Sequence, residues 1–308
     1  MNSSMASAAS SRAEFRAAGT DLSERRRSGV SRGPLIDLVR PSGTPDIEWD
    51  AGGSVRISAF ASIAAIAADP KLREAYPGLA AAAGGLATPQ VRHVATLGGN
   101  LAQRSRCWYY RDPHIACLKK GGATCPAREG NHLYGVAFDL GPCVAPHAST
   151  MAAALLAYDA TVKTNLRERV TVEQLLGDGS SGVSDNTLAQ GEIIESVELG
   201  IPTANERALY RRAISRSYAE WPLVEVVVRA VIENGTFKLV RIVSGAIAPV
   251  PLRLRAAESA AQGAIANTAT IARTVAQSTL GAKPLGMTGY KLDLLQGLIR
   301  DLLERISP

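Results

Sequence analysis

The sequence lacks the features of a membrane-spanning or exported protein. No stretch approaches the roughly 18 consecutive apolar residues that a membrane-spanning helix requires. The N-terminal segment MNSSMASAASSRAEF contains no apolar core, so it is unlike a secretory signal peptide. We therefore expect a cytoplasmic protein without a membrane span.

The usual motifs of hydrolytic enzymes are absent as well. There is no G-x-S-x-G sequence around a nucleophilic serine and no G-x-x-x-x-G-K-[ST] phosphate loop. Only four histidines occur in 308 residues, and no hydrolytic constellation forms around them. The net charge of +6 permits an acidic partner, but the basic residues are scattered, which is weak support for nucleic-acid binding.

Cysteine is missing from almost the whole chain, because all four cysteines fall between residues 107 and 143. A protein of this size does not need disulfides for stability, and a reducing cytoplasm would not keep them. The cysteines could still be small buried apolar residues, two disulfides or metal ligands. The residues concerned are Cys107, Cys117, Cys125 and Cys143.

The spacing C-x9-C-x7-C-x17-C does not contain the close C-x2-4-C pairs of a structural zinc site. Thiolates from a loose loop suit an iron–sulfur cluster better, because such a cluster is large and its ligands stand apart. His114 and His147 are alternative ligands, although each is more typical of a hydrogen-bonding loop residue. Five cations nearby would offset the cluster's negative charge: Arg104, Arg106, Arg111, Lys119 and Lys120.

Two turns of small residues, AAGTDL at 17–22 and TLGGNLAQ at 96–103, are each able to expose consecutive backbone N–H groups. Such an arrangement can hold a pyrophosphate. Neither turn is the G-x-G-x-x-G of dinucleotide-binding folds, and each alone is more typical of an ordinary tight turn than of a phosphate site.

The first part of the chain alternates short strands and helices. We expect a buried strand at 33–40, a hairpin at 47–60 that turns at Gly52-Gly53, and helical structure over 61–87 interrupted by two prolines. Residues 104–147 show little periodicity, which indicates a functional loop. A helix capped by Ser149 follows it.

The remainder of the chain has a different pattern. The polar stretch 177–192 is predicted to connect two domains. Residues 223–247 form two β-rich runs around Asn234-Gly235, a strong hairpin signal. Helical stretches at 253–277 and 290–306 come after it, and hairpins followed by helices predict an α+β domain.

Taken together, the two turns resemble the paired motifs A-G-G-T-D/N-L and T-x-G-G-N-L of the FAD-binding medium subunits of molybdenum hydroxylases, the xanthine dehydrogenase and carbon monoxide dehydrogenase family. They lie about 80 residues apart, and TPQVR at 88–92 leads into the second. The resemblance implies that FAD binds at Ala17, Ala18, Gly19, Thr20, Asp21, Leu22, Thr96, Gly98, Gly99, Asn100 and Ile194.

The cysteine loop is similar to that of a subgroup with an added [4Fe-4S] cluster, which includes periplasmic aldehyde oxidoreductases and 4-hydroxybenzoyl-CoA reductase. This similarity implies that the four cysteines are the cluster ligands. Three features depart from the family. The lead-in before the first motif is short, Ala18 replaces a glycine, and Ser149-Thr150 replaces a Ser-Asp pair whose carboxylate can contact FAD.

The resemblance also implies the architecture. The fold class is α+β, with a two-lobed FAD-binding domain of the carbon monoxide dehydrogenase flavoprotein and vanillyl-alcohol-oxidase-like type and a smaller α+β C-terminal domain. The FAD-binding domain is expected over 1–200, with subdomains at about 1–53 and 54–176 and the iron–sulfur loop at 104–147. The C-terminal domain is expected over 206–308.

The function implied is electron transfer. A large molybdenum-cofactor subunit would hydroxylate an aldehyde or N-heterocycle, and a small subunit with two [2Fe-2S] clusters would relay electrons to FAD here and on to an external acceptor. The three chains would form a heterotrimer or its dimer, and co-export with a partner is the route to the periplasm. The alternatives are a free-standing FAD oxidoreductase and a zinc- or cluster-stapled nucleic-acid-binding protein.

Overall fold

The computed structural model describes residues 13–217 and 219–307. The N-terminal part is built on a five-stranded sheet in the order β3-β4-β7-β5-β6, in which every neighbouring pair is antiparallel. The expected hairpin at 47–60 is confirmed as β3 and β4. The strands are β3 (Ile47–Trp49), β4 (Val55–Ser58), β5 (Thr161–Thr164), β6 (Val170–Thr171) and β7 (Ile194–Leu199).

A small second unit precedes this sheet. Strand β1 (Glu14–Arg16) pairs in parallel with β2 (Leu35–Asp37), and helix α2 (Leu22–Arg27) connects them. The strand expected at 33–40 is therefore present, but its side chains are half-buried or exposed rather than buried. The sequence before residue 13, which contains most of the short lead-in to the first motif, lies outside the described residues.

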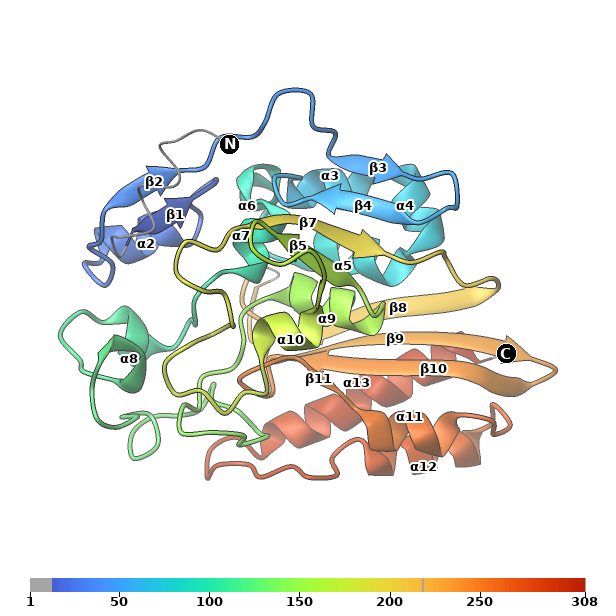
Figure 1. Cartoon of the computed structure of the whole chain (residues 1–308). Helices are drawn as coiled ribbons and strands as arrows, with labels where there is room; N and C mark the ends of the chain where they lie inside the picture. Colours follow the sequence, from blue (N-terminus) through green and yellow to red (C-terminus); the bar gives the residue numbers. More distant parts are fainter. Residues whose placement is uncertain (1–12, 218, 308) are drawn as a thin grey trace.

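Short helices cover one side of the five-stranded sheet (Figure 1). Pro70 and Pro77 each occupy the first helical position, where the missing N–H costs no hydrogen bond, so the expected helical stretch is three helices. The helices of this layer are α3 (Ile63–Ala68), α4 (Pro70–Ala75), α5 (Pro77–Gly85), α6 (Pro89–Val94), α7 (Leu97–Leu101) and α10 (Val172–Leu176).

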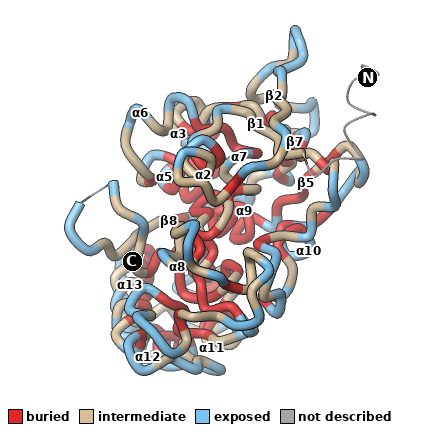
Figure 2. Tube along the Cα trace, turned by 90° about the vertical axis from the view of Figure 1, so that its left-hand side faces the viewer, coloured by how far each residue is buried: buried red, intermediate tan, exposed pale blue. Residues whose placement is uncertain are grey.

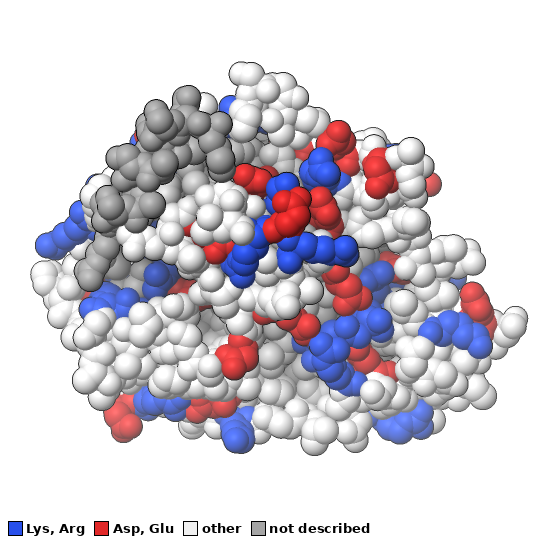
Figure 3. Space-filling model, viewed as in Figure 1, with Lys and Arg blue, Asp and Glu red and all other residues white. Residues whose placement is uncertain are grey.

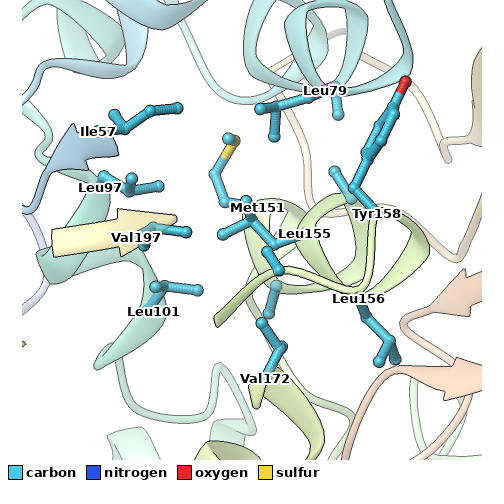
Figure 4. Packing of buried hydrophobic residues seen from close by; sticks show 14 of the residues in the cluster. Ile57, Leu79, Leu97, Leu101, Met151, Leu155, Leu156, Tyr158, Val172 and Val197 are labelled. Atoms are coloured by element: carbon cyan, nitrogen blue, oxygen red, sulfur yellow. The ribbon is translucent and has the colours of Figure 1, made fainter. Parts of the chain in front are cut away.

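Helix α9 (Thr150–Ala157) is the centre of the N-terminal core, and every one of its residues is buried. The Ser149 side chain accepts a hydrogen bond from the Ala152 N–H, which confirms the expected cap. Met151 and Leu155 project between Leu79 of α5 and Val197 of β7 (Figure 4). Because α9 is apolar on all sides, it packs between the sheet and the C-terminal domain rather than on the surface.

Residues 104–147 form the expected irregular loop, which contains only α8 (Trp108–Arg111) and the single 3-10 turn η2 (Leu118–Lys120) among its described elements. The loop lies at one end of the molecule, below α2 and beside the C-terminal domain (Figure 1).

The expectation that 177–192 connects two domains is wrong. This stretch folds back along the cysteine loop, where Asp185 is buried and paired with Arg104 at 2.5 Å and Lys119 at 2.8 Å. It then enters β7, a central strand of the N-terminal sheet. The polar residues had suggested a solvated linker because Arg104, one of the two partners of Asp185, lies 81 residues away in the sequence.

The C-terminal part is a four-stranded antiparallel sheet, β11-β10-β9-β8, with three helices against one face (Figure 1). Asn234 and Gly235 both take positive φ, as a two-residue hairpin turn requires, and confirm the predicted turn. The elements are β8 (Glu206–Ala213), β9 (Val224–Glu233), β10 (Thr236–Gly245), β11 (Leu252–Arg253), α11 (Arg255–Ala261), α12 (Thr268–Gln277) and α13 (Tyr290–Ile306).

Buried residues run from the N-terminal sheet through α9 into the C-terminal sheet (Figure 2). Val227 and Val243 of the C-terminal sheet belong to the same buried cluster as α9, whereas Val226 and Val228 face the C-terminal helices. The two α+β parts are therefore packed together, and the expected fold class is confirmed. Within the described residues no helix is both long and apolar enough to cross a membrane.

Candidate functional site: two motif cavities and a cysteine loop

The two glycine motifs meet at a pair of cavities. The first, which we call the Ile194 cavity, has a volume of about 320 Å³ and is bordered by Ala17, Thr96, Gly98, Gly99 and Ile194. The second, the Thr150 cavity, has about 210 Å³ and is bordered by Thr20, Asp21, Gly99, Asn100 and Thr150. Gly99 borders both. Among the residues predicted to bind FAD, Ala18, Gly19 and Leu22 do not line either cavity.

Gly19 shapes the first motif without lining the cavities. Its φ is +75°, and a Cβ there would lie 2.7 Å from Ser23 Oγ, so only glycine fits without strain. Within the described residues, no group accepts a hydrogen bond from the N–H of Gly19 or Thr20. This turn therefore keeps backbone donors that an anionic ligand can use.

The second motif is not the turn that the sequence suggested. Residues 97–101 form the short helix α7, and Thr96 Oγ1 caps it by accepting from the Gly99 N–H. The N–H groups of Gly98 and Asn100 donate to Ala59 O and Thr96 O, both at 2.9 Å. Because these donors already have partners, the contribution of this motif is its small size: a Cβ on Gly98 would lie 2.8 Å from the Ala59 Cβ.

Asp21 is held by arginines. Its carboxylate pairs with Arg25 at 3.1 Å, Arg106 at 3.1 Å and Arg111 at 2.6 Å, and it accepts from the Arg104 N–H at 3.1 Å. Burial alone would raise the pKa of Asp21, but the charges of Arg106 and Arg111 outweigh it and hold the pKa below its usual range. Asp21 therefore fastens the first glycine motif to the start of the cysteine loop.

The side chains around α9 include a carboxylate that the sequence did not reveal. Glu225 of β9 is buried and accepts hydrogen bonds from Thr150 Oγ1 and Tyr210 OH, both at 2.8 Å. Burial raises the pKa of Glu225. Thr150 thus links α9 to β9 of the C-terminal sheet beside the Thr150 cavity. No local pattern could have paired residues 75 positions apart.

The four cysteines border one small cavity, together with Tyr109, Tyr110 and Lys119. None of the four forms a disulfide. A hydrogen bond from the Cys143 thiol lowers the pKa of Cys125, and the same contact raises that of Cys143. Burial raises the pKa of Cys107, with a further contribution from the nearby Cys125 and Cys117.

Within the described residues, no three His, Cys, Asp or Glu side chains converge on a position for a single metal ion. His114 and His147 do not line the cysteine cavity. The cations expected to offset a cluster charge are partly engaged elsewhere, since Arg104 and Lys119 share Asp185. Arg128, which the sequence reasoning missed, lies close enough to Cys125 and Cys143 to feel their charge.

His147 provides a test of this packing. The imidazole is buried, Nδ1 accepts from the Ser149 N–H at 3.2 Å, and no partner for Nε2 occurs among the described residues. Burial lowers the pKa of His147 from 6.5 to about 4. Between pH 6.5 and pH 4, His147 therefore binds a proton in the unfolded chain but not in the folded chain. The contribution of His147 to the free energy of unfolding is complete above pH 6.5 and is lost as the pH falls to about 4.

We expect this decline to reach roughly 3 kcal/mol in the free energy of unfolding. Urea unfolding at a series of pH values, compared between the natural protein and His147→Gln, measures it. The Gln variant should lose this part of the pH dependence. Equal slopes in the two proteins would contradict the buried neutral imidazole.

Comparison with known proteins follows the same division of the chain. Residues 3–203 match the family described as the FAD binding domain in molybdopterin dehydrogenase, and residues 209–306 match the CO dehydrogenase flavoprotein C-terminal domain. The aldehyde oxidoreductase FAD-binding subunit PaoB of Escherichia coli K12 is 32% identical over 255 residues, which cover 80% of this chain and 78% of the relative. The putative xanthine dehydrogenase FAD-binding subunit XdhB of the same organism is 24% identical over 248 residues, which cover 80% of this chain and 70% of that relative.

Solved structures share the fold. A chain of quinoline 2-oxidoreductase from Pseudomonas putida 86 superposes with a TM-score of 0.74 at 19% identity, covering 98% of this chain and 91% of that one. A chain of carbon monoxide dehydrogenase from Hydrogenophaga pseudoflava superposes with the same TM-score and identity, covering 99% of this chain and 93% of that one.

Proposed function

Because this chain belongs to the family of FAD-binding subunits of the molybdopterin dehydrogenases, we propose that it transfers electrons within an aldehyde-oxidising molybdenum hydroxylase. The observation that carries the proposal is the meeting of the two glycine motifs at Gly99, between two adjoining cavities. The aldehyde substrate class is suggested by the 32% identity to an aldehyde oxidoreductase subunit.

The described residues fit FAD. An elongated dinucleotide needs two compartments and a narrow waist, and Gly99 lies where the Ile194 cavity and the Thr150 cavity meet. The free N–H groups of Gly19 and Thr20 are donors suited to the diphosphate. Ala17, Thr96, Gly98 and Ile194 would border one half of the cofactor. FAD, when bound, accepts electrons singly or in pairs and releases them to a different partner.

We further propose that Cys107, Cys117, Cys125 and Cys143 hold a [4Fe-4S] cluster. The support is that all four thiols are free and border one shared cavity. That cavity has a volume of about 10 Å³, so a cluster would have to push the four side chains apart. A cluster has four iron corners, so its ligands need not converge on the one point that a single ion would require. Two cations interact electrostatically with these thiols: Lys119 with Cys143, and Arg128 with Cys125 and Cys143.

The proposed partners are a large molybdenum-cofactor subunit and a small subunit with two [2Fe-2S] clusters, in a heterotrimer or its dimer, with an external electron acceptor. We propose a cytoplasmic location, with export alongside a partner as the alternative, and a domain boundary between residues 200 and 206. That boundary coincides with the short connection between β7 and β8.

The nucleic-acid-binding alternative requires a continuous basic face. On the face shown in Figure 3, basic and acidic side chains alternate, and the arginines beside the cysteine loop are paired with Asp21 and Asp185. The observation that would favour a free-standing FAD oxidoreductase is stable purification without partners.

The test is the absorption spectrum and metal content of the purified protein. We expect one flavin and about four irons per chain, from the ligand count. Zinc without flavin would contradict the proposal and favour the nucleic-acid-binding alternative. Flavin without iron would leave the FAD assignment intact and remove the cluster.

A further inference from the structure

A third cavity, which neither the FAD site nor the cysteine site uses, lies between them. Its volume is about 340 Å³, within the range of roughly 300–1,000 Å³ that small-molecule sites occupy. It shares Cys107 and Tyr109 with the cysteine cavity, and Arg106 and Trp221 with the Thr150 cavity. We call it the Trp108 cavity. Its position places any occupant next to both proposed redox sites.

The walls of the Trp108 cavity are aromatic. Trp108 and Tyr134 meet edge to face with their ring centroids 5.3 Å apart, and the Arg106 guanidinium covers the Trp221 ring at 4.4 Å. These rings are partly open to solvent, since Trp108 is 57%, Tyr134 42% and Trp221 46% exposed. Three large rings gathered around one hollow provide flat surfaces on which another planar ring can stack.

Lys291, the second residue of α13, supplies the polar group of the cavity. It is 1% exposed, and its Nζ donates to Ala246 O at 2.8 Å and Tyr134 O at 3.4 Å. Burial lowers the pKa of Lys291 to about 7, so the side chain gains its third N–H donor when it is protonated. That third donor has no acceptor among the described residues, and no carboxylate there forms an ion pair with Lys291. Burying a protonated lysine raises the free energy of the folded state unless its remaining N–H finds an acceptor, and a ligand oxygen would be one.

We propose that the Trp108 cavity binds a quinone, with the ring stacked among Trp108, Tyr134 and Trp221 and a carbonyl oxygen accepting a hydrogen bond from Lys291. The aromatic walls select a planar ring, and the spare donor of Lys291 selects an oxygen on it. The adjoining redox sites favour a quinone over an inert aromatic molecule. Only this last step rests on the proposed function.

Electrons balance in the exchange that this location allows. The quinone would take up two electrons and two protons and leave as the hydroquinone. Both would come from the two-electron-reduced, doubly protonated flavin of the proposed function, which would return to its oxidised form. Lys291 would hold the oxygen that gains a proton.

Binding to the full-length protein tests the site without relying on turnover. Equilibrium dialysis with 2-methyl-1,4-naphthoquinone should show one saturable site per chain. Lys291→Met should weaken binding roughly tenfold or more, the effect of losing one hydrogen bond to a charged group. Trp108→Ala, a surface change that leaves the core intact, should weaken it to a similar extent. Lys238→Met, an exposed lysine on β10, serves as the matched control and should bind as the natural protein does.

Thermal unfolding of each variant shows whether Lys291→Met folds, and Trp108→Ala keeps the test decisive if it does not. Absence of a saturable site would overturn the proposal, as would quinone affinity in both variants equal to that of the natural protein. Binding of 2-naphthoate but not of the quinone would overturn the ligand class. Flavin absorbance of the same samples distinguishes the quinone site from the proposed FAD function. Bound flavin without quinone binding would refute the quinone site alone. Quinone binding without flavin would support the quinone site and refute FAD as the proposed electron donor.

Discussion

Replacing Gly98 with valine is expected to weaken FAD binding about 100-fold. Even the first carbon of a side chain would lie 2.8 Å from the Ala59 Cβ and 3.3 Å from its carbonyl oxygen, and neither can rotate away. The helix α7 must then shift, which breaks the Gly98 N–H bond to Ala59 O and narrows the Ile194 cavity. Overpacking of this kind costs about 1–3 kcal/mol before the cofactor is considered.

Titration of flavin-free protein with FAD measures the change, and released flavin per purified chain provides a second readout. Gly84→Ala is the matched control, because a Cβ there has its nearest contact at 3.8 Å, from the Ala67 Cβ. The control should bind FAD normally and gain about 0.5–1 kcal/mol of stability, as alanine does over glycine within a helix. Normal FAD affinity in Gly98→Val would disprove the role given to this glycine.

Replacing Cys117 with serine is expected to reduce the iron content from about four atoms per chain to less than about one. A serine hydroxyl is nearly the size of a thiol, so the buried position should pack normally, but it does not ionise near neutral pH and is a poor iron ligand. Iron analysis and loss of the broad visible absorption of the cluster measure the effect. Thr124→Ser, an exposed change in the same loop, is the control and should retain its iron.

The same variant tests how far the two cofactor sites depend on each other. Arg106 and Arg111 tie the start of the cysteine loop to Asp21 of the first glycine motif at 3.1 Å and 2.6 Å. These ion pairs do not involve Cys117, so we expect FAD affinity to fall by no more than about tenfold. Complete loss of flavin along with the iron would show instead that the cluster itself holds the flavin motif in place. Four irons retained in Cys117→Ser would refute the ligand assignment.

Local sequence signals predicted those features that depend on a few neighbouring residues. Pro70 and Pro77 interrupt the helical stretch as predicted, and in the structure each begins a new helix because proline suits the first helical position. Asn234-Gly235 turns a hairpin because both residues tolerate positive φ. Ser149 caps α9 through its own side chain. The paired glycine motifs and the clustered cysteines were equally visible, because each depends on residue type and spacing alone.

Other features could not be predicted, because they depend on partners far away in the sequence. The stretch 177–192 has the composition of a solvated linker, but in the fold its Asp185 is buried and forms ion pairs with Arg104 and Lys119. Residues 97–101 read as a turn, yet contacts with Ala59 and the cap by Thr96 make them a helix. Both predictions were wrong for the same reason. Polar and small residues are typical of solvated or flexible segments, and the sequence does not show when a distant residue pairs with them or packs against them.

The sequence by itself determined which chemistry this protein can hold, namely two small-residue motifs suited to a dinucleotide and four thiols in one loop. The tertiary structure alone decided how these parts are joined. It brought the motifs together at Gly99, linked the cysteine loop to Asp21, and placed Lys291 and three aromatic rings around a third cavity. Residue identity limits the interactions a side chain can make, but burial and distance, which arise only on folding, determine which of them it makes.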